Sequence, residues 1–194
     1  STVYSNSSWW RGVQEPFSGA WQKNITADPP TSLLASSVVY ACVTGIAADI
    51  AKMRIKLSQN NDGIWEEVLS GAPWLQLLRK PNHYQTRIKF IEQWIVSKLL
   101  CGNAYIFKER DNRGVVSRLY VLNPLRVQTL VANDGSVYYK LATDYLSQVE
   151  EHVTVPASEI IHDMTTSLWH PLVGVPPIYA CAMSATMGNK IQSN

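Results

Sequence analysis

The sequence predicts an α+β fold in which helices pack on short mixed or antiparallel β-hairpins. Two observations lead to this prediction. Apolar residues recur at helical spacing from Phe90 to Leu99, whereas after Gly102 they gather in short runs of Val, Ile, Tyr and Phe that are typical of strands. Clusters of turn-forming residues separate several such runs, as in hairpins: they are Asn60-Asn61-Asp62-Gly63, Asp111-Asn112-Arg113-Gly114 and Asn133-Asp134-Gly135.

The first part of the chain is expected to contain an arm, a helix and a hairpin. Residues 1–31 are rich in Ser, Asn, Gly and Pro without any period, which predicts an irregular amino-terminal arm. Thr31 or Ser32 provides an N-cap for a helix over Ser32–Met53. A hairpin of strands Arg54–Gln59 and Ile64–Val68 follows it. The helix face expected to pack on another element consists of Leu34, Val38, Cys42 or Ala41, Gly45 and Ala48.

A long helix over Thr86–Cys101 is the centre of the predicted core. A short helix over Pro73–Lys80 precedes it and is stopped by Pro81. The long helix leads into the two strands around the turn at 111–114. The residues expected to pack together here are Trp94, Phe90 and Ile91 of the helix with Ile106 and Leu119 of the strands.

The remaining elements are short. A hairpin is predicted over Arg126–Leu141, and short strands at Val153–Val155 and Glu159–Asp163. A helix begins at Pro176 or Pro177, the position at which proline favours a first helical turn. This helix is still in mid-period at residue 194, so we expect it to continue into a carboxyl-terminal half.

Composition indicates an ordinary globular protein. Of the 194 residues 46% are hydrophobic, and the net charge of +2 carries no signature of a dedicated nucleic-acid-binding domain. No apolar run approaches the ~20 residues that span a bilayer, and no signal-peptide pattern is present. Cys42, Cys101 and Cys181 follow neither disulfide nor zinc spacing, so we expect buried, reduced thiols in a protein made in the cytoplasm.

The residues whose chemistry could serve catalysis or metal binding do not match the spacing of any catalytic or metal-binding motif. His152, His162 and His170 lie near acidic residues, but their spacing matches no metal motif, and satisfied or exposed histidines are favoured. Ser97 and Ser184 lack the context of a serine nucleophile, and no Gly-rich phosphate loop is present. The sequence therefore predicts neither an enzyme nor a cofactor or metal site.

Two groups of basic residues are candidates for contact with phosphate. The first consists of Arg79, Lys80, Arg87 and Lys89, and the second of Lys108, Arg110, Arg113 and Arg118. Either group offers the charge for non-specific contact with a nucleic-acid backbone. A solvated face, partly paired with nearby carboxylates, is favoured for both.

Three segments together resemble the portal proteins of tailed bacteriophages, with the greatest likeness to the Hong Kong ninety-seven group of long-tailed phages. They are residues 32–57, beginning SLLASSVVYACV, residues 77–127, containing FIEQWIVSKLLCGNAYIF and YVLNPLRV, and residues 155–190, containing PLVGVPPIYA. The segments cover most of residues 32–194. Their order and spacing, rather than any single motif, carry the resemblance.

The resemblance implies a structural function. Portal proteins form a homo-oligomeric ring, typically of twelve subunits, at one capsid vertex of the virion, and double-stranded DNA passes non-specifically through the ring during packaging and ejection. The ring contacts the major capsid protein, docks terminase and later carries the head–tail adaptor. Within the family fold, residues 32–175 would form a region similar to the wing and clip, and residues 176–194 would begin a helix toward the stem.

Candidate surfaces follow from this expectation. The aromatic residues of the arm, Trp9, Trp10, Phe17 and Trp21, are candidates for an oligomer interface, since a head-to-tail ring needs two different surfaces per subunit. Lys190 is the candidate for the DNA channel, with an inter-subunit solubilising role as its alternative. Given the nearly neutral chain, we expect any DNA contact to be weak and blind to sequence.

Two other function classes stay open from the sequence. One is an unrelated phage adaptor or baseplate structural module, and the other is a small hydrolase with an unrecognised site. A chain that continues beyond residue 194 through further helix favours the portal interpretation, whereas an independent enzyme would end soon.

Overall fold

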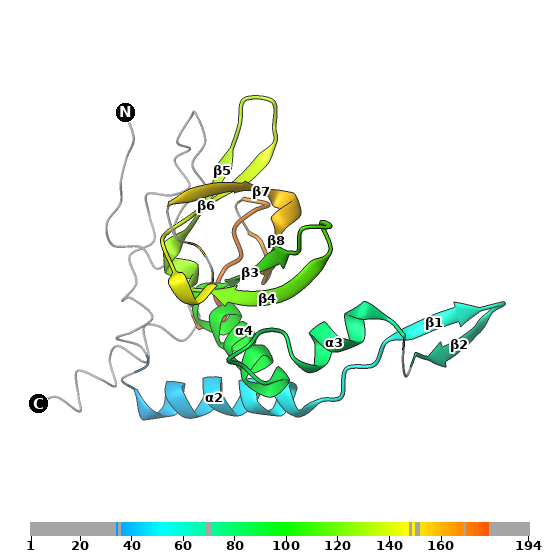
Figure 1. Ribbon diagram of the computed structural model, residues 1–194. Helices are drawn as coiled ribbons and strands as arrows, with labels where there is room; N and C mark the ends of the chain where they lie inside the picture. Colours follow the sequence, from blue (N-terminus) through cyan, green and yellow to red (C-terminus); the bar gives the residue numbers. More distant parts are fainter. Residues whose placement is uncertain are drawn as a thin grey trace, which may run out of the picture.

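The computed structural model of the protein describes residues 34, 36–68, 71–147, 149, 152–168 and 170–178. The described part is an α+β fold of helices and antiparallel sheets, as the sequence predicts (Figure 1). The α-helices are α2 (Ser37–Lys52), α3 (Pro73–Arg79) and α4 (Arg87–Cys101). The strands are β1 (Ser58–Asn61), β2 (Ile64–Glu67), β3 (Asn103–Arg110), β4 (Val116–Leu122), β5 (Val127–Val131), β6 (Val137–Leu141), β7 (Val153–Pro156) and β8 (Ile160–Met164).

The strands form three antiparallel sheets. β1 and β2 make an isolated hairpin, which projects away from the rest of the fold (Figure 1). The second sheet has the order β4-β3-β8 and the third the order β5-β6-β7. Short 3-10 helices connect some of these strands, at Pro124–Arg126, Tyr145–Ser147 and Ala157–Glu159.

Strand β3 is buried on both faces and organises the layers. Alternate side chains of a strand point to opposite faces of its sheet. Ala104 and Ile106 face α4, where they pack with Phe90. Tyr105 faces the third sheet, where it packs with residues such as Leu141. Helix α4 therefore covers one face of the β4-β3-β8 sheet and the β5-β6-β7 sheet covers the other.

The packing predicted around Trp94 is confirmed. Trp94 and Ile91 lie against the cluster formed by Phe90, Ile106 and neighbouring residues, and Leu119 joins it from β4. The rings of Phe90 and Trp94 meet edge to face with centroids 5.9 Å apart. The Trp94 side chain is only partly buried, because its indole N–H reaches the rim of the core.

Helix α4 has a conventional cap at each end. The Thr86 hydroxyl accepts a hydrogen bond from the Lys89 backbone N–H at 3.4 Å, which satisfies one free donor of the first turn. At the other end Gly102 is left-handed, with φ of 69°, and donates to the Lys98 carbonyl. The expected end at Cys101 is confirmed, whereas Thr86, expected as the first helical residue, is the N-cap.

Helix α2 packs on α4, but through a face other than the one predicted. Val43, Ala47 and Ala51 are its buried residues, whereas Val38 is 69% exposed and Cys42 is exposed. The expected face and the expected burial of Cys42 are therefore wrong. The reason is that small and apolar residues occur on every side of this helix, so the sequence is compatible with more than one buried face.

Some predicted boundaries also need correction. Helix α2 begins at Ser37 rather than Ser32, and Leu34 lies in a turn. The serine-rich approach offers several N-caps, and Ser36 occupies that position. The first strand of the hairpin begins at Ser58 rather than Arg54, so residues 54–57 approach it as extended chain. The helix predicted from Pro176 falls largely outside the described residues.

Candidate functional site

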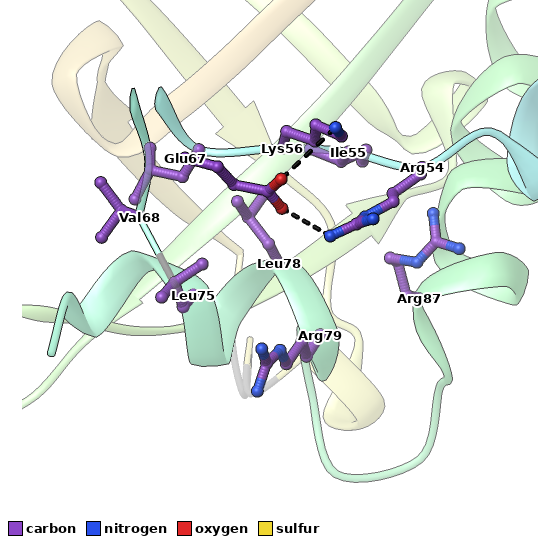
Figure 2. Close-up of a pocket in the computed structure, with 10 residues that line it drawn as sticks. Arg54, Ile55, Lys56, Glu67, Val68, Leu75, Leu78, Arg79 and Arg87 are labelled. Atoms are coloured by element: carbon purple, nitrogen blue, oxygen red, sulfur yellow. Dashed lines mark hydrogen bonds and ion pairs between the residues drawn. The ribbon is translucent and has the colours of Figure 1, made fainter. Parts of the chain in front are cut away.

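A pocket of about 210 Å³ lies at the base of the β1–β2 hairpin (Figure 2). The extended residues 54–57 and the end of β2 form one side of it, and α3 and the first residue of α4 form the other. The hairpin is closed here by a hydrogen bond from the Val68 N–H to the Leu57 carbonyl at 2.8 Å. This bond joins the two chain segments that carry Arg54, Lys56 and Glu67.

Two basic side chains converge on one carboxylate in the pocket. Arg54 and Lys56 are two residues apart on extended chain, so their side chains point the same way. Arg54 Nη2 lies 2.6 Å from Glu67 Oε1, and Lys56 Nζ lies 3.3 Å from Glu67 Oε2 (Figure 2). All three side chains keep contact with solvent, so these ion pairs orient the groups more than they stabilise the fold.

Arg79 and Arg87 complete the charged lining. Arg87 donates to the Met53 carbonyl at 2.7 Å and, more weakly, to the Ala51 carbonyl at 3.4 Å. It thereby ties the start of α4 to the end of α2, where carbonyls favour a nearby cation. The Arg79 side chain is exposed and has no hydrogen bond or ion pair within the described part of the chain.

Apolar side chains form the rest of the pocket. They are Ile55, Leu57, Val68, Leu75 and Leu78. Leu75, Leu78 and Arg79 fall on one face of α3, because residues three and four apart are neighbours on a helix. The pocket thus combines an apolar wall with a positively charged rim.

Large apolar residues outside the pocket are also exposed. On α2 they include Val38, Tyr40 and Ile46, with 69%, 57% and 48% of their surface accessible. On the hairpin Ile64 and Trp65 are 65% and 70% exposed. Exposed large apolar side chains are candidates for contact with a partner when they gather in a patch.

The most polar part of the interior surrounds His162 of β8. Its Nε2 lies 3.1 Å from Asn103 Oδ1, an acceptor, and its Nδ1 lies 3.0 Å from the Tyr139 hydroxyl. The ring stacks on Tyr105 with centroids 4.4 Å apart. These contacts suit a neutral imidazole with the proton on Nε2, accepting from Tyr139. Burial lowers the pKa of His162 to about 4, against the opposing effect of Asp163.

This network links separate parts of the fold. Asn103 Oδ1 also accepts from the Gly174 N–H at 3.0 Å, and its amide donates to the Cys101 carbonyl at 3.0 Å. His162 belongs to the β4-β3-β8 sheet and Tyr139 to the β5-β6-β7 sheet. The arrangement is therefore structural: it joins the two sheets and the segment around Gly174.

Stability is expected to fall as the pH falls from about 6.5 toward 4, because the unfolded chain then protonates His162 while the folded chain does not. With a folded pKa of about 4, about 2 kcal/mol is lost between pH 7.5 and 5. Urea unfolding of the wild type and His162→Gln at both pH values measures this loss. The variant should lack this part of the pH dependence, and equal slopes for the two proteins would contradict the prediction.

The structure does not bring the three predicted histidines together. His152 forms a hydrogen bond with the Thr143 hydroxyl, and His170 accepts one from the Leu172 N–H. Neither of these hydrogen bonds involves His162. Asp163 binds Trp94 and Lys98, and Glu159 pairs with Arg110. Within the described ranges no group of three or more His, Cys, Asp or Glu side chains is placed to hold a metal ion.

The other predicted site residues lie outside the described residues: they are Trp9, Trp10, Phe17, Trp21 and Lys190. The second basic group is largely paired, since Arg110, Arg113 and Arg118 bind Glu159, Asp111 and Glu109. Among the helices that the structure describes, none is long and apolar enough to cross a membrane.

Sequence reasoning missed Arg54, Lys56 and Glu67 as members of a common site. The available signal was the alternation of Arg54 and Lys56 before a hairpin whose turn sets Glu67 opposite Ser58. The loop before α4 is shaped by the buried Asn82. The Asn82 side chain accepts from the Gln85 N–H at 2.8 Å and donates to the Leu119 carbonyl at 3.0 Å.

Comparison with known families decides the class of the protein. The family model described as "Phage portal protein" matches residues 37–194 of this chain. The chain belongs to the phage portal protein family. A portal-family chain is a structural protein rather than a member of a known enzyme family.

Solved structures agree with this family at the level of the fold. The portal-family chain is similar to a chain in the neck of an empty gene transfer agent particle computed with C6 symmetry, with a TM-score of 0.70 and 23% identity. That match covers 84% of this chain and 44% of the other. A chain in the neck of the native particle, computed with C12 symmetry, gives a TM-score of 0.65 and 22% identity over 84% of this chain and 43% of the other.

Two curated relatives from Rickettsia also match this portal-family chain. An "Uncharacterized protein" of Rickettsia felis is 28% identical over 137 residues, which cover 70% of this chain and 33% of the relative. A protein of Rickettsia bellii with the same name is 28% identical over 137 residues, 69% of this chain and 33% of its own length. The chain thus spans about a third of the length of these relatives.

Proposed function

We propose that this chain is part of a portal protein that forms a ring at one capsid vertex, through which double-stranded DNA passes during packaging and ejection. The family match over residues 37–194 carries the proposal. The fold is similar to chains of particle necks computed with C6 and C12 symmetry, which supports a ring. A ring of twelve subunits, and membership of the Hong Kong ninety-seven group, belong to this proposal.

The regions of the chain receive roles within this proposal. Residues 32–175 would form the wing-like and clip-like region, residues 1–31 an arm that contacts a neighbour, and residues 176–194 the beginning of a helix toward the stem. Terminase, the head–tail adaptor and the major capsid protein are the proposed partners, and synthesis takes place in the host cytoplasm. The protein is proposed to have no catalytic activity.

The exposed side of α2 is proposed as one of the two ring surfaces. Val38 and Ile46 are exposed there although α2 packs its other side on α4. A helix that is apolar on both sides is stable in water when both sides are covered. A second copy of the chain is the occupant that a head-to-tail ring provides.

Light scattering of the protein from its complete coding sequence tests the ring. We expect a mass many times that of one subunit, and expect Ile46→Asp to shift the population toward smaller species, because a charge then enters an apolar interface. Val115→Asp is the matched control, since Val115 is similarly exposed on the β3–β4 turn. A strictly monomeric protein at micromolar concentration, at every salt concentration tested, would contradict the proposal.

A further inference from the structure

The pocket at the base of the β1–β2 hairpin contains more positive charges than its single carboxylate neutralises. Four basic side chains and one carboxylate line it, which leaves a local charge of +3, whereas the whole chain carries +2. Glu67 compensates Arg54 and Lys56, and Arg87 binds backbone carbonyls that carry no full charge. Arg79 has neither kind of partner among the described residues. The excess charge of the chain is thus concentrated at one concave site.

The apolar walls of the pocket favour a ligand that combines a negative charge with an apolar group. Leu75 and Leu78 of α3 lie below the Glu67 carboxylate in Figure 2, and Val68 closes the end near β2. Trp65 is two residues from Glu67 on β2 and therefore shares its face. It is 70% exposed, and Trp74 on α3 is 58% exposed. Tryptophan and arginine are the residues most enriched at the energetic centres of protein interfaces.

We propose that this pocket is a docking site for a segment of a partner protein that presents a carboxylate beside an apolar side chain. The partner's carboxylate binds Arg79, and its apolar side chain packs on Leu75 and Leu78. Binding of a guanidinium to a carboxylate is a short, charge-assisted contact with defined direction. The Glu67 carboxylate already occupies the other half of the pocket, held by Arg54 and Lys56 in the same manner.

The observations favour a peptide over a nucleic-acid backbone. A duplex presents a regular row of phosphates and no apolar group, and non-specific DNA binding uses broad basic surfaces. The pocket is instead concave, apolar on one side and limited to about 210 Å³. Glu67 repels a run of phosphates more strongly than a single carboxylate. The inference concerns one subunit, so it holds whether or not the chain forms a ring.

Fluorescence anisotropy with short labelled peptides tests the proposal. One peptide alternates glutamate and leucine among serines, the second carries glutamine in place of glutamate, and a short DNA duplex is the third probe. We expect the glutamate peptide to bind the wild type, and to bind Arg79→Ala roughly tenfold more weakly, because one charge-assisted contact is lost. Glu67→Gln should bind it more tightly, since that change removes the repulsion and frees Arg54 and Lys56.

Arg113→Ala is the matched control variant. Arg113 is an exposed arginine paired with Asp111 on the distant β3–β4 turn, so its removal takes the same charge from another place. We expect its binding to equal that of the wild type. Because Arg79 is exposed and unpaired in the described structure, Arg79→Ala should keep the melting temperature of the wild type, which separates a binding effect from misfolding.

Three results would overturn the proposal. Equal binding of the glutamate and glutamine peptides would show a merely apolar site. Equal weakening by Arg79→Ala and Arg113→Ala would show attraction by net charge alone. Tighter binding of the duplex, lost in Arg79→Ala, would assign the pocket to phosphate. None of these outcomes depends on assembly, so a failed docking site and a failed ring are distinguishable.

Discussion

Replacing Gly102 with alanine is expected to destabilise the protein by about 2–5 kcal/mol, because a left-handed backbone costs about 1–2 kcal/mol and an overpacked contact about 1–3 kcal/mol. Gly102 has φ of 69°, a region that L side chains rarely adopt. An added Cβ would also overlap the backbone of Gly174 and Pro176. Hydrogen bonds fix the positions of Gly102 and Gly174. The Thr165 N–H donates to the Gly102 carbonyl at 2.9 Å, and the Gly174 N–H donates to Asn103 Oδ1.

Gly135→Ala separates the two contributions. Gly135 has φ of 84°, but nothing lies within 4 Å of the position its Cβ would take. This control is expected to lose only the conformational part, about 1–2 kcal/mol. Urea unfolding of the three proteins measures the difference. Equal losses in the two variants would mean that the close approach of Gly102 to Gly174 does not constrain the fold.

Removal of the Trp94 side chain should have the second large effect, about 3 kcal/mol for Trp94→Ala. This value lies at the low end for truncation of a large core residue, because Trp94 is partly exposed. The change also removes the hydrogen bond from the indole N–H to Asp163 Oδ2 at 2.8 Å. Among the described residues, Asp163 would keep only Lys98 as its side-chain partner, at 2.8 Å from Nζ to Oδ1.

Two further tryptophan variants separate the causes of this loss of stability. Trp94→Phe keeps an aromatic ring against Phe90 but loses the hydrogen bond, so we expect a cost of about 1–2 kcal/mol. Trp65→Ala is the matched control, since a side chain that is 70% exposed should change stability by less than about 0.5 kcal/mol. Thermal or urea unfolding compares them. Unchanged stability in Trp94→Ala would show that this face of α4 is not part of the core.

The elements with strong local signals were predictable from the sequence. Helix α4 has Thr86 as an N-cap and Gly102 as a left-handed end, and both signals depend on local backbone chemistry. The β5–β6 hairpin likewise follows from the turn residues at 133–135, and the pairing of Val131 with Val137 agrees with that turn. In these cases local chemistry and tertiary packing favour the same structure.

The features set by tertiary contacts were not predictable in the same way. The buried face of α2 depends on where α4 lies, and the helix sequence alone fits several faces. The burial of His162 arises from Asn103 and Tyr139, which belong to different strands far apart in the chain. The pocket combines residues 54–57, the end of β2, α3 and Arg87, and no local pattern joins segments so separated. Family resemblance, by contrast, was visible because it rests on the order of whole segments.

Negative-stain electron microscopy of the protein from its complete coding sequence tests the central claim most directly. A portal protein should appear as closed rings with a central hole in views along the ring axis. Rings of twelve subunits are the expected class, and Ile46→Asp should reduce their number while Val115→Asp does not. Isolated single subunits without rings, at the concentration and salt at which the protein is folded, would contradict the account.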